Sequence, residues 1–329
     1  MVPGVRARRV LLLLLLVVTG CTLMVTAGCT LLTQPVRPSQ TRGPTVHADA
    51  ARLQADVVAL AHPREYPDTE TLDRVARGLG RQLADLGYEP VEQPFEVKGR
   101  TFRNVSTVLG DPAAPRVVVG AHYDSCGPLP AADDNASGVA VVLELARLFK
   151  QHPPPGAVEL VFWSLEEPPV FNTGGMGSVW HAKALRDGGV RVTAALSIET
   201  VGYYKDDEDT QHFPVPLIGA LYPSRGNFIA LVSNLRDTAL VRTVKSAMLG
   251  TRRIPVYSMN GPELVPGIDW SDHASYWKVG YPALMVTDTA PNRNPAYHEA
   301  SDTPDTLDYG KMARVTEALF EAIWVLAEQ

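Results

Sequence analysis

From residue 116 onward, short apolar runs alternate with segments whose apolar residues recur at helical spacing. The runs that predict strands are residues 116–121, 158–163, 192–198 and 282–286. The segments that predict helices are residues 138–149, 177–185, 231–248 and 311–327. Strands alternating with helices in this way favour a largely parallel sheet with helices on both faces. We therefore predict an α/β fold, a three-layer α/β/α sandwich around a central mixed, mostly parallel sheet.

A helix and a hairpin are predicted ahead of this region. Residues 71–86 carry leucine and valine on one face of a helix, and Gly87 ends it. Residues 91–97 and 102–109 then predict two strands separated by a turn around Gly99. No internal repeat is present, so solenoids and propellers are disfavoured.

The N-terminus has the pattern of an export signal. Three arginines within the first nine residues precede an unbroken run of valine and leucine over residues 10–18. The tetrapeptide that ends at Cys21 is similar to the lipoprotein box of bacteria, so Cys21 is the expected lipidation site, and Cys29 is a second candidate. We therefore predict that residues 1–32 are an export signal or membrane anchor.

Other interpretations of this segment stay open. Residues 10–32 are long enough to cross ~30 Å of hydrocarbon as an uncut helix, and cleavage without lipidation would give ordinary secretion. Every interpretation places the remaining chain outside the cytoplasm, either secreted or held in the cell envelope by an N-terminal lipid or the uncut helix. Residues 33–45, rich in proline, glutamine, serine and threonine, are then expected to form a flexible linker.

Charge and cysteine content exclude some classes of protein. The net charge is -6, from 30 basic and 36 acidic residues, so no nucleic-acid partner is expected. Only Cys126 lies beyond the N-terminal segment, so no disulfide framework is available. Signature motifs of zincins, P-loop proteins, dinucleotide-binding domains and α/β-hydrolases are absent from the sequence.

Polar residues able to bind metal follow the predicted strands where each strand ends or precede the following helix. The candidates are His122, Asp124, Asp134, Glu166, Glu167, Glu199, Tyr297 and His298. Each residue alone has an ordinary explanation, as a surface group, a helix-terminal acid or a solvated turn. Because the carboxyl ends of parallel strands meet at one edge of a sheet, we expect these side chains to converge. Residues 46–329 should then form a single catalytic domain.

In order along the chain, these residues resemble the signature of the co-catalytic di-zinc exopeptidases, metallopeptidase family 28. That family includes secreted bacterial aminopeptidases, glutamate carboxypeptidase II and glutaminyl cyclases. The matching elements are His122-x-Asp124, Asp134-Asn135-Ala136-Ser137-Gly138, Glu166-Glu167, Glu199 and Tyr297-His298. The resemblance implies two Zn²⁺ ions, one held by His122, Asp134 and Glu199. The other would be held by Asp134, Glu167 and His298, with Asp134 bridging the ions.

The resemblance also implies roles for the remaining three residues. Glu166 would be the general base, Asp124 would accept the other imidazole N–H of His122, and Tyr297 would donate to the developing oxyanion. Glu199 stands where many relatives have aspartate. The loop after Glu167 is longer than in better-known members.

The implied function is a zinc-dependent exopeptidase, most simply an aminopeptidase acting on peptides with a free N-terminus. The acidic charge balance suits a substrate that carries an ammonium group. A glutaminyl cyclase-like acyltransferase and a catalytically inactive, peptidase-like binding module remain as alternatives. Residues 270–273 are expected either to lie near the substrate pocket or to pack a loop, and Cys126 is expected to be a small loop residue.

Overall fold

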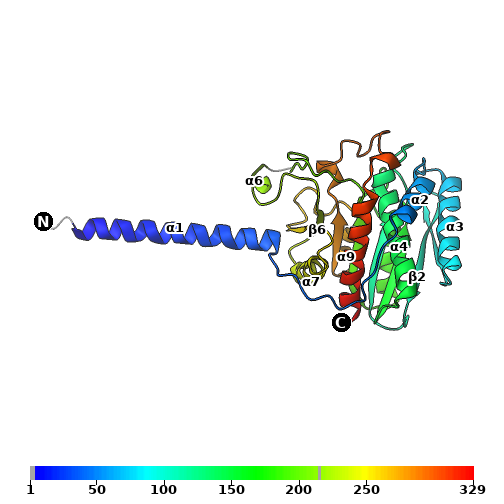
Figure 1. Ribbon diagram of the computed structural model, residues 1–329, viewed down its shortest axis with the longest axis horizontal. Helices are drawn as coiled ribbons and strands as arrows, with labels where there is room; N and C mark the ends of the chain where they lie inside the picture. The colour runs from blue at the N-terminus through cyan, green and yellow to red at the C-terminus, as the bar shows by residue number, and fades with distance from the viewer. Residues whose placement is uncertain (1–3, 214–215) are drawn as a thin grey trace.

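The computed structural model describes residues 4–213 and 216–329. Their side chains are described too, except for those of residues 4–17 and 216–217. Helix α1 (Gly4–Thr33) projects away from the body of the molecule (Figure 1). Residues 1–3 of the predicted export segment lie outside the described residues. In the part of the chain that is described, no helix is both long and apolar enough to cross a membrane.

The described chain forms one eight-stranded sheet. Its strands are β1 (Val91–Val97), β2 (Arg100–Leu109), β3 (Arg116–His122), β4 (Ala157–Trp163), β5 (Val192–Glu199), β6 (Ile229–Ser233), β7 (Val256–Asn260) and β8 (Ala283–Thr287). They are ordered β1-β2-β4-β3-β5-β8-β6-β7. Pairs β1/β2, β2/β4 and β8/β6 are antiparallel, and the other four neighbouring pairs are parallel. The predicted mixed, mostly parallel sheet is confirmed.

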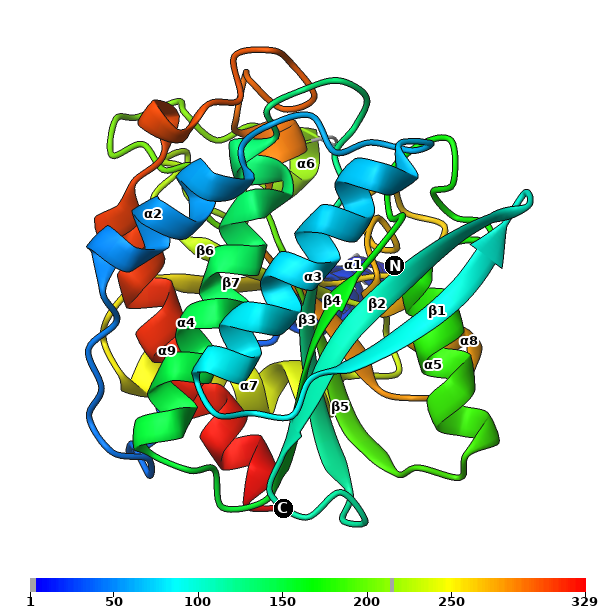
Figure 2. The ribbon, with the colours of Figure 1, turned by 90° about the vertical axis from the view of Figure 1, so that its right-hand side faces the viewer.

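Helices cover both faces of this sheet. One face packs against α2 (Ala50–Leu60), α3 (Thr69–Asp85), α4 (Gly138–Gln151), α7 (Thr238–Gly250) and α9 (Tyr309–Ala327). The other face packs against α5 (Gly177–Asp187) and α8 (His273–Lys278). Figure 2 shows α3 and α4 on one side of the sheet and α5 on the other. The remaining short elements are α6 (Pro216–Gly219), η1 (Ala132–Ser137), η2 (Ala290–Asn292) and η3 (Pro304–Thr306).

Aspartates mark where three of the helices begin. The side chain of Asp68 accepts a hydrogen bond from the backbone N–H of Thr71, and Asp49 and Asp308 do the same for α2 and α9. An N-terminal carboxylate satisfies backbone N–H groups that have no partner inside the helix. This explains why α3 begins at Thr69, two residues before the start predicted from its apolar stripe.

Strand β3 occupies the middle of the sheet, between β4 and β5. Every residue of β3 is buried, with Val117 and Val119 in the core beside α4 and Val118 in the core beside α5. Burial on both faces is why the run is continuously apolar. Its last residue, His122, pairs in register with Trp163 at the end of β4. The carboxyl ends of the central strands therefore meet at one edge.

The predicted helix over residues 231–248 is wrong in its first part. Residues Ile229–Ser233 are strand β6, entirely buried between β7 and β8, and the helix begins only at Thr238. A five-residue apolar run has no periodicity that separates a buried strand from a helix. The structure also contains α2, β7 and α8, which the sequence did not predict.

The segment between α1 and α2 lies along the body. The backbone N–H of Ser39 donates to the carbonyl of Ser246 at 3.0 Å. The N–H groups of Arg42 and Gly43 donate to the carboxylate of Glu321 at 2.7 and 3.0 Å. These contacts hold residues 39–43, within the segment expected to be a linker, against α7 and α9.

Candidate active site

The predicted site residues lie together at the carboxyl edge of the sheet. His122 and Glu199 are the last residues of β3 and β5. Glu166 and Glu167 lie in the loop after β4, Asp134 lies in η1 ahead of α4, and His298 lies in the loop after β8. All of these side chains are buried except that of His298, which is 31% exposed.

Two of these loops turn through the left-handed backbone region. Leu165, directly before Glu166, has φ of 64°, and His298 itself has φ of 57°. A non-glycine residue held there costs ~1–3 kcal/mol, so the surrounding contacts must impose the conformation. The two turns direct Glu166 and His298 toward the other site residues.

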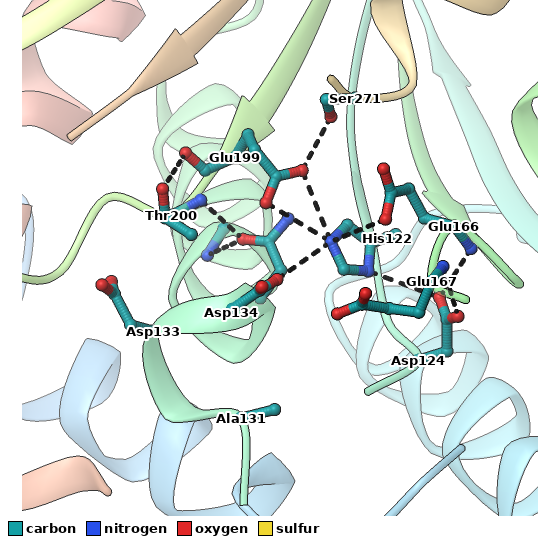
Figure 3. A network of polar contacts seen from close by, with 12 residues as sticks. His122, Asp124, Ala131, Asp133, Asp134, Glu166, Glu167, Glu199, Thr200 and Ser271 are labelled. Atoms are coloured by element: carbon teal, nitrogen blue, oxygen red, sulfur yellow. Dashed lines mark hydrogen bonds and ion pairs between the residues drawn. The ribbon is translucent and has the colours of Figure 1, made fainter. Parts of the chain in front are cut away.

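The first group of candidate metal donors surrounds His122 (Figure 3). Its Nε2 atom lies 3.3 Å from Oδ1 of Asp134 and 3.4 Å from both carboxylate oxygens of Glu199. Donor atoms of the three residues all lie within 4.8 Å of one another. One ion could therefore contact all three side chains.

The second group surrounds His298. Its Nε2 atom lies 3.0 Å from Oδ2 of Asp134 and 3.4 Å from Oε2 of Glu167. Asp134 thus faces His122 with one oxygen and His298 with the other. Figure 3 shows the neighbouring Asp133 turned away from His122, and its carboxylate accepts from Gly202 and Asn294 instead. Of the two adjacent aspartates, only Asp134 is placed to bridge two ions.

Several donor atoms in these groups lack a hydrogen-bond partner. Among the described residues, Oδ1 of Asp134, Oε1 of Glu167 and Nε2 of His298 are buried and form no hydrogen bond. Buried charged groups are costly unless they are paired or coordinate a metal. Imidazole and carboxylate are also the donors that zinc prefers. The residues present therefore fit a zinc centre.

The pKa shifts of the site residues also fit a metal centre. Burial raises the pKa of Glu167 to about 8, and burial raises the pKa of Glu166 well above its usual value, with Glu199 adding to the effect. Burial alone would lower the pKa of His298, but the neighbouring carboxylates of Asp134 and Glu167 raise it to about 10. Protons on these groups offset the crowded negative charge, which is what a divalent cation would do.

The carboxylate of Asp124 contacts both the paired glutamates and His122. Its two oxygens accept hydrogen bonds from the backbone N–H groups of Glu166 and Glu167 at 3.0 and 3.1 Å. Its Oδ1 also lies 3.3 Å from Nδ1 of His122. One carboxylate therefore positions the paired glutamates as well as the imidazole.

Residues 104–323 match the family model described as Peptidase family M28, a stretch that contains all the candidate metal donors. The chain belongs to peptidase family M28. It is 39% identical over 289 residues to the uncharacterized protein YfbL of Escherichia coli, covering 84% of this chain and 88% of that protein. It is 28% identical over 241 residues to a probable leucine aminopeptidase of Arthroderma otae, covering 67% of this chain and 55% of that protein.

Solved structures share the fold. The LapA aminopeptidase of Legionella pneumophila matches with a TM-score of 0.69 at 19% identity, covering 88% of this chain and 78% of that chain. The glutaminyl cyclase of Fimbriiglobus ruber matches with a TM-score of 0.65 at 22% identity, covering 88% of this chain and 99% of that chain. Membership of family M28, together with the aminopeptidase relatives, makes the protein a hydrolase of the exopeptidase type that acts on peptides.

This M28 site includes supporting residues that sequence reasoning missed. Ser271 donates to Oε2 of Glu199 at 2.7 Å and lies 2.9 Å from the hydroxyl of Ser197. Asp302 accepts from the backbone N–H groups of Asp133 and Asp134 at 2.9 and 3.1 Å. Ser271 falls in segment 270–273, for which the sequence leaves open a place near the pocket or in loop packing, but nothing near Asp302 in the sequence signals its role.

A cavity of about 390 Å³ opens beside the candidate metal donors. Its lining includes Asp134, Glu166, Glu167, Glu199, Tyr297 and His298. The side chains around the remainder are mostly apolar and include Phe228, Tyr257, Met259, Ile268, Trp270 and Met285. The ring of Tyr297 stacks on His298 with centroids 3.9 Å apart. Segment 270–273 therefore serves the site through Trp270 and Ser271, while His273 is buried and bonded to the carbonyl of Ile268.

Proposed function

We propose that the protein is a zinc aminopeptidase that removes N-terminal residues from peptides. The observation that carries the proposal is the pair of donor groups that share Asp134. One Zn²⁺ would be held by His122, Asp134 and Glu199, and a second by Asp134, Glu167 and His298. Carboxylates bridge such ion pairs at ~3.5–4 Å separation in co-catalytic hydrolases.

Zinc, when bound, supplies the Lewis-acid chemistry that makes water a nucleophile at neutral pH. Glu166 accepts a proton from the attacking water and returns it to the leaving amine. Burial, which raises the pKa of Glu166, suits a group that must hold a proton between these steps. The hydrogen bond from the backbone of Glu166 to Asp124 keeps the carboxylate facing His122, with Oε2 and Nε2 4.0 Å apart.

The adjoining cavity would hold the first side chain of the peptide. Its apolar lining favours a large apolar residue, since a charged side chain would lose its water there without gaining a partner. Tyr297 would donate its hydroxyl to the developing oxyanion, and stacking on His298 keeps its ring in place. The carboxylates at the base of the cavity favour a substrate whose free N-terminus carries positive charge.

The variant Glu166→Gln tests the assignment of the base. The amide keeps the shape of the side chain but cannot take a proton, so we expect zinc content to stay unchanged and kcat to fall by ~10²–10⁴-fold. Glu263→Gln is the matched control, because Glu263 is an exposed glutamate that forms an ion pair with Arg236. Unchanged hydrolysis by Glu166→Gln would remove Glu166 from the mechanism.

Substrate class is tested with aminoacyl, dipeptidyl and N-blocked chromogenic substrates, with and without a chelator. We expect chelator-sensitive release from free aminoacyl substrates, fastest when the first residue is large and apolar. Equal cleavage of blocked and free N-termini would overturn the aminopeptidase proposal.

The second candidate is glutaminyl cyclization, favoured by the shared fold of the Fimbriiglobus ruber glutaminyl cyclase. A zinc content near one ion per chain, together with pyroglutamate formed from an N-terminal glutamine peptide, would support it. A binding module without activity is the third candidate. The complete set of donors and the base argue against it, and hydrolysis by the zinc-loaded protein would exclude it.

We propose further that residues 1–32 direct the protein to the cell envelope, with Cys21 lipidated after cleavage. The arginines followed by an apolar run support this proposal. Mass spectrometry of the mature N-terminus distinguishes lipidation at Cys21 from an uncut helix and from plain secretion. Cys21→Ser should release the protein from membranes, whereas Cys29→Ser should not.

A further inference from the structure

The thiol of Cys126 lies beside the second donor group. Its Sγ atom, a carboxylate oxygen of Glu167 and a ring nitrogen of His298 all lie within 4.8 Å of one another. The Glu167 side chain is only 4% exposed, and its Oε1 forms no hydrogen bond among the described residues. A buried, unpartnered carboxylate thus faces the same small space as the thiol and the imidazole.

The loop that carries Cys126 is fixed by buried hydrogen bonds. The backbone N–H of Arg64 donates to the hydroxyl of Ser125 at 3.0 Å, and that hydroxyl donates to the carbonyl of Gly127 at 3.0 Å. The guanidinium of Arg64 donates to the carbonyl of Tyr123 at 2.7 Å. These bonds hold the residues on either side of Cys126, so the position of its thiol beside Glu167 is set by the fold.

We propose that Cys126 is a protein ligand of the second metal ion, bound as the thiolate. The inference rests on the proposed binding of an ion by Asp134, Glu167 and His298. Thiolate sulfur is a strong zinc donor, and a coordinated thiol gives up its proton to solvent. Cys126 would bring the protein donors of this ion to four.

This ligand makes the two metal sites unequal. Four protein donors including a thiolate complete the tetrahedral arrangement typical of closed zinc sites. The first site, with His122, Asp134 and Glu199, has three donors and keeps a position open for water. The site that contains Cys126 should therefore bind metal before the other site and should prefer softer, thiophilic metals. The site formed by His122, Asp134 and Glu199 is then the one at which water is activated.

Cobalt(II) is the probe, because sulfur-to-cobalt charge transfer absorbs in the near ultraviolet whether or not the enzyme turns over. Metal-free full-length protein is titrated with Co²⁺ through two equivalents. We expect the charge-transfer band to develop with the first equivalent and to be absent in Cys126→Ser. The variant should also bind one of its two ions at least 10-fold more weakly. Cys29→Ser, which removes a thiol on α1, should keep the band.

A second measurement uses the wild-type thiol directly, so the inference stays testable if Cys126→Ser does not fold. The metal-free protein should have one more thiol that reacts with the disulfide reagent DTNB than the zinc-bound protein, because Cys21 and Cys29 on α1 are free in both and only Cys126 is protected by zinc. The inference is wrong if two cobalt ions bind without a charge-transfer band, or if zinc leaves the reactivity of Cys126 unchanged. In those outcomes hydrolysis of aminoacyl substrates would still support the proposed function. A band without hydrolysis would overturn the function and leave the ligand assignment in place.

Discussion

Arg64 is a fully buried arginine beside the site, and we expect its removal to lower the free energy of unfolding of the protein. Its side chain is 0% exposed. Its guanidinium donates five hydrogen bonds, all to backbone carbonyls, at distances of 2.7–3.1 Å. The acceptors are the carbonyls of Leu60, His62, Tyr123, Pro130 and Ala131. These bonds tie the end of α2 to both ends of the loop that carries Asp124 and Cys126.

The magnitude follows from this inventory. A hydrogen bond to a charged group contributes ~1.5–3 kcal/mol, and a buried carbonyl left without a partner costs ~1–3 kcal/mol. Summed over five bonds, these values are an upper limit, because water entering the space left by Arg64→Ala would satisfy some carbonyls. We expect the free energy of unfolding to fall by at least ~4 kcal/mol, a large share of the ~5–15 kcal/mol typical of a domain.

The positive charge of Arg64 adds to this effect. Burial lowers the pKa of Arg64 to about 10, with the carboxylates of Asp124 and Asp134 opposing the shift. The side chain therefore stays protonated at neutral pH, and its loss leaves those carboxylates uncompensated in the metal-free protein. Zinc should restore part of the stability lost in Arg64→Ala.

Urea unfolding followed by circular dichroism measures the change, with Arg100→Ala as the control. Arg100 is exposed and donates one hydrogen bond, to the carbonyl of Pro67 at 2.8 Å. Arg64→Lys keeps the charge but not the five donors, and we expect it to lose at least ~2 kcal/mol. If both Arg64 variants matched the control within ~1 kcal/mol, the argument from buried hydrogen bonds would be refuted.

Two further predictions concern metal binding. Ser271→Ala removes the hydrogen bond to Glu199 and should weaken zinc binding by ~10–100-fold. The control is Ser275→Ala, which removes a buried serine hydrogen-bonded to Ser178 and should leave zinc binding unchanged. Equal zinc affinities of the two variants, measured by competition with a chelator, would contradict this. The pKa of Glu167 in the metal-free protein is raised to about 8, so zinc must displace a proton from this carboxylate at lower pH. The apparent affinity for zinc should therefore increase as the pH is raised through about 8. Calorimetry in buffers of different ionisation enthalpy should register net proton release, and pH-independent affinity would count against the assignment.

Much of the fold could be predicted from the sequence because its central strands are long, buried and apolar. Strands β3, β4 and β5 lie within one residue of their predicted limits. The convergence of the candidate donors could also be predicted, since polar residues that follow such strands meet at one edge of a parallel sheet. Strand β6 was missed because its five apolar residues carry no periodicity that distinguishes strand from helix.

The supporting residues could not be predicted, because nothing local marks them. Asp302 lies 168 residues from Asp134, whose backbone it holds. The sequence indicated Ser271 only as part of segment 270–273, and its partner Glu199 lies 72 residues away. Such pairs come together only when separate strands and loops pack against one another.

The sequence by itself determined the central strands β3, β4 and β5 and the polar residues that follow them, because local periodicity and residue chemistry are written along the chain. Only the tertiary structure decided that Asp124 holds the backbone of the paired glutamates. It alone placed the thiol of Cys126 beside Glu167 and His298. These facts depend on the direction in which each side chain points once distant segments pack, and no local pattern encodes that direction.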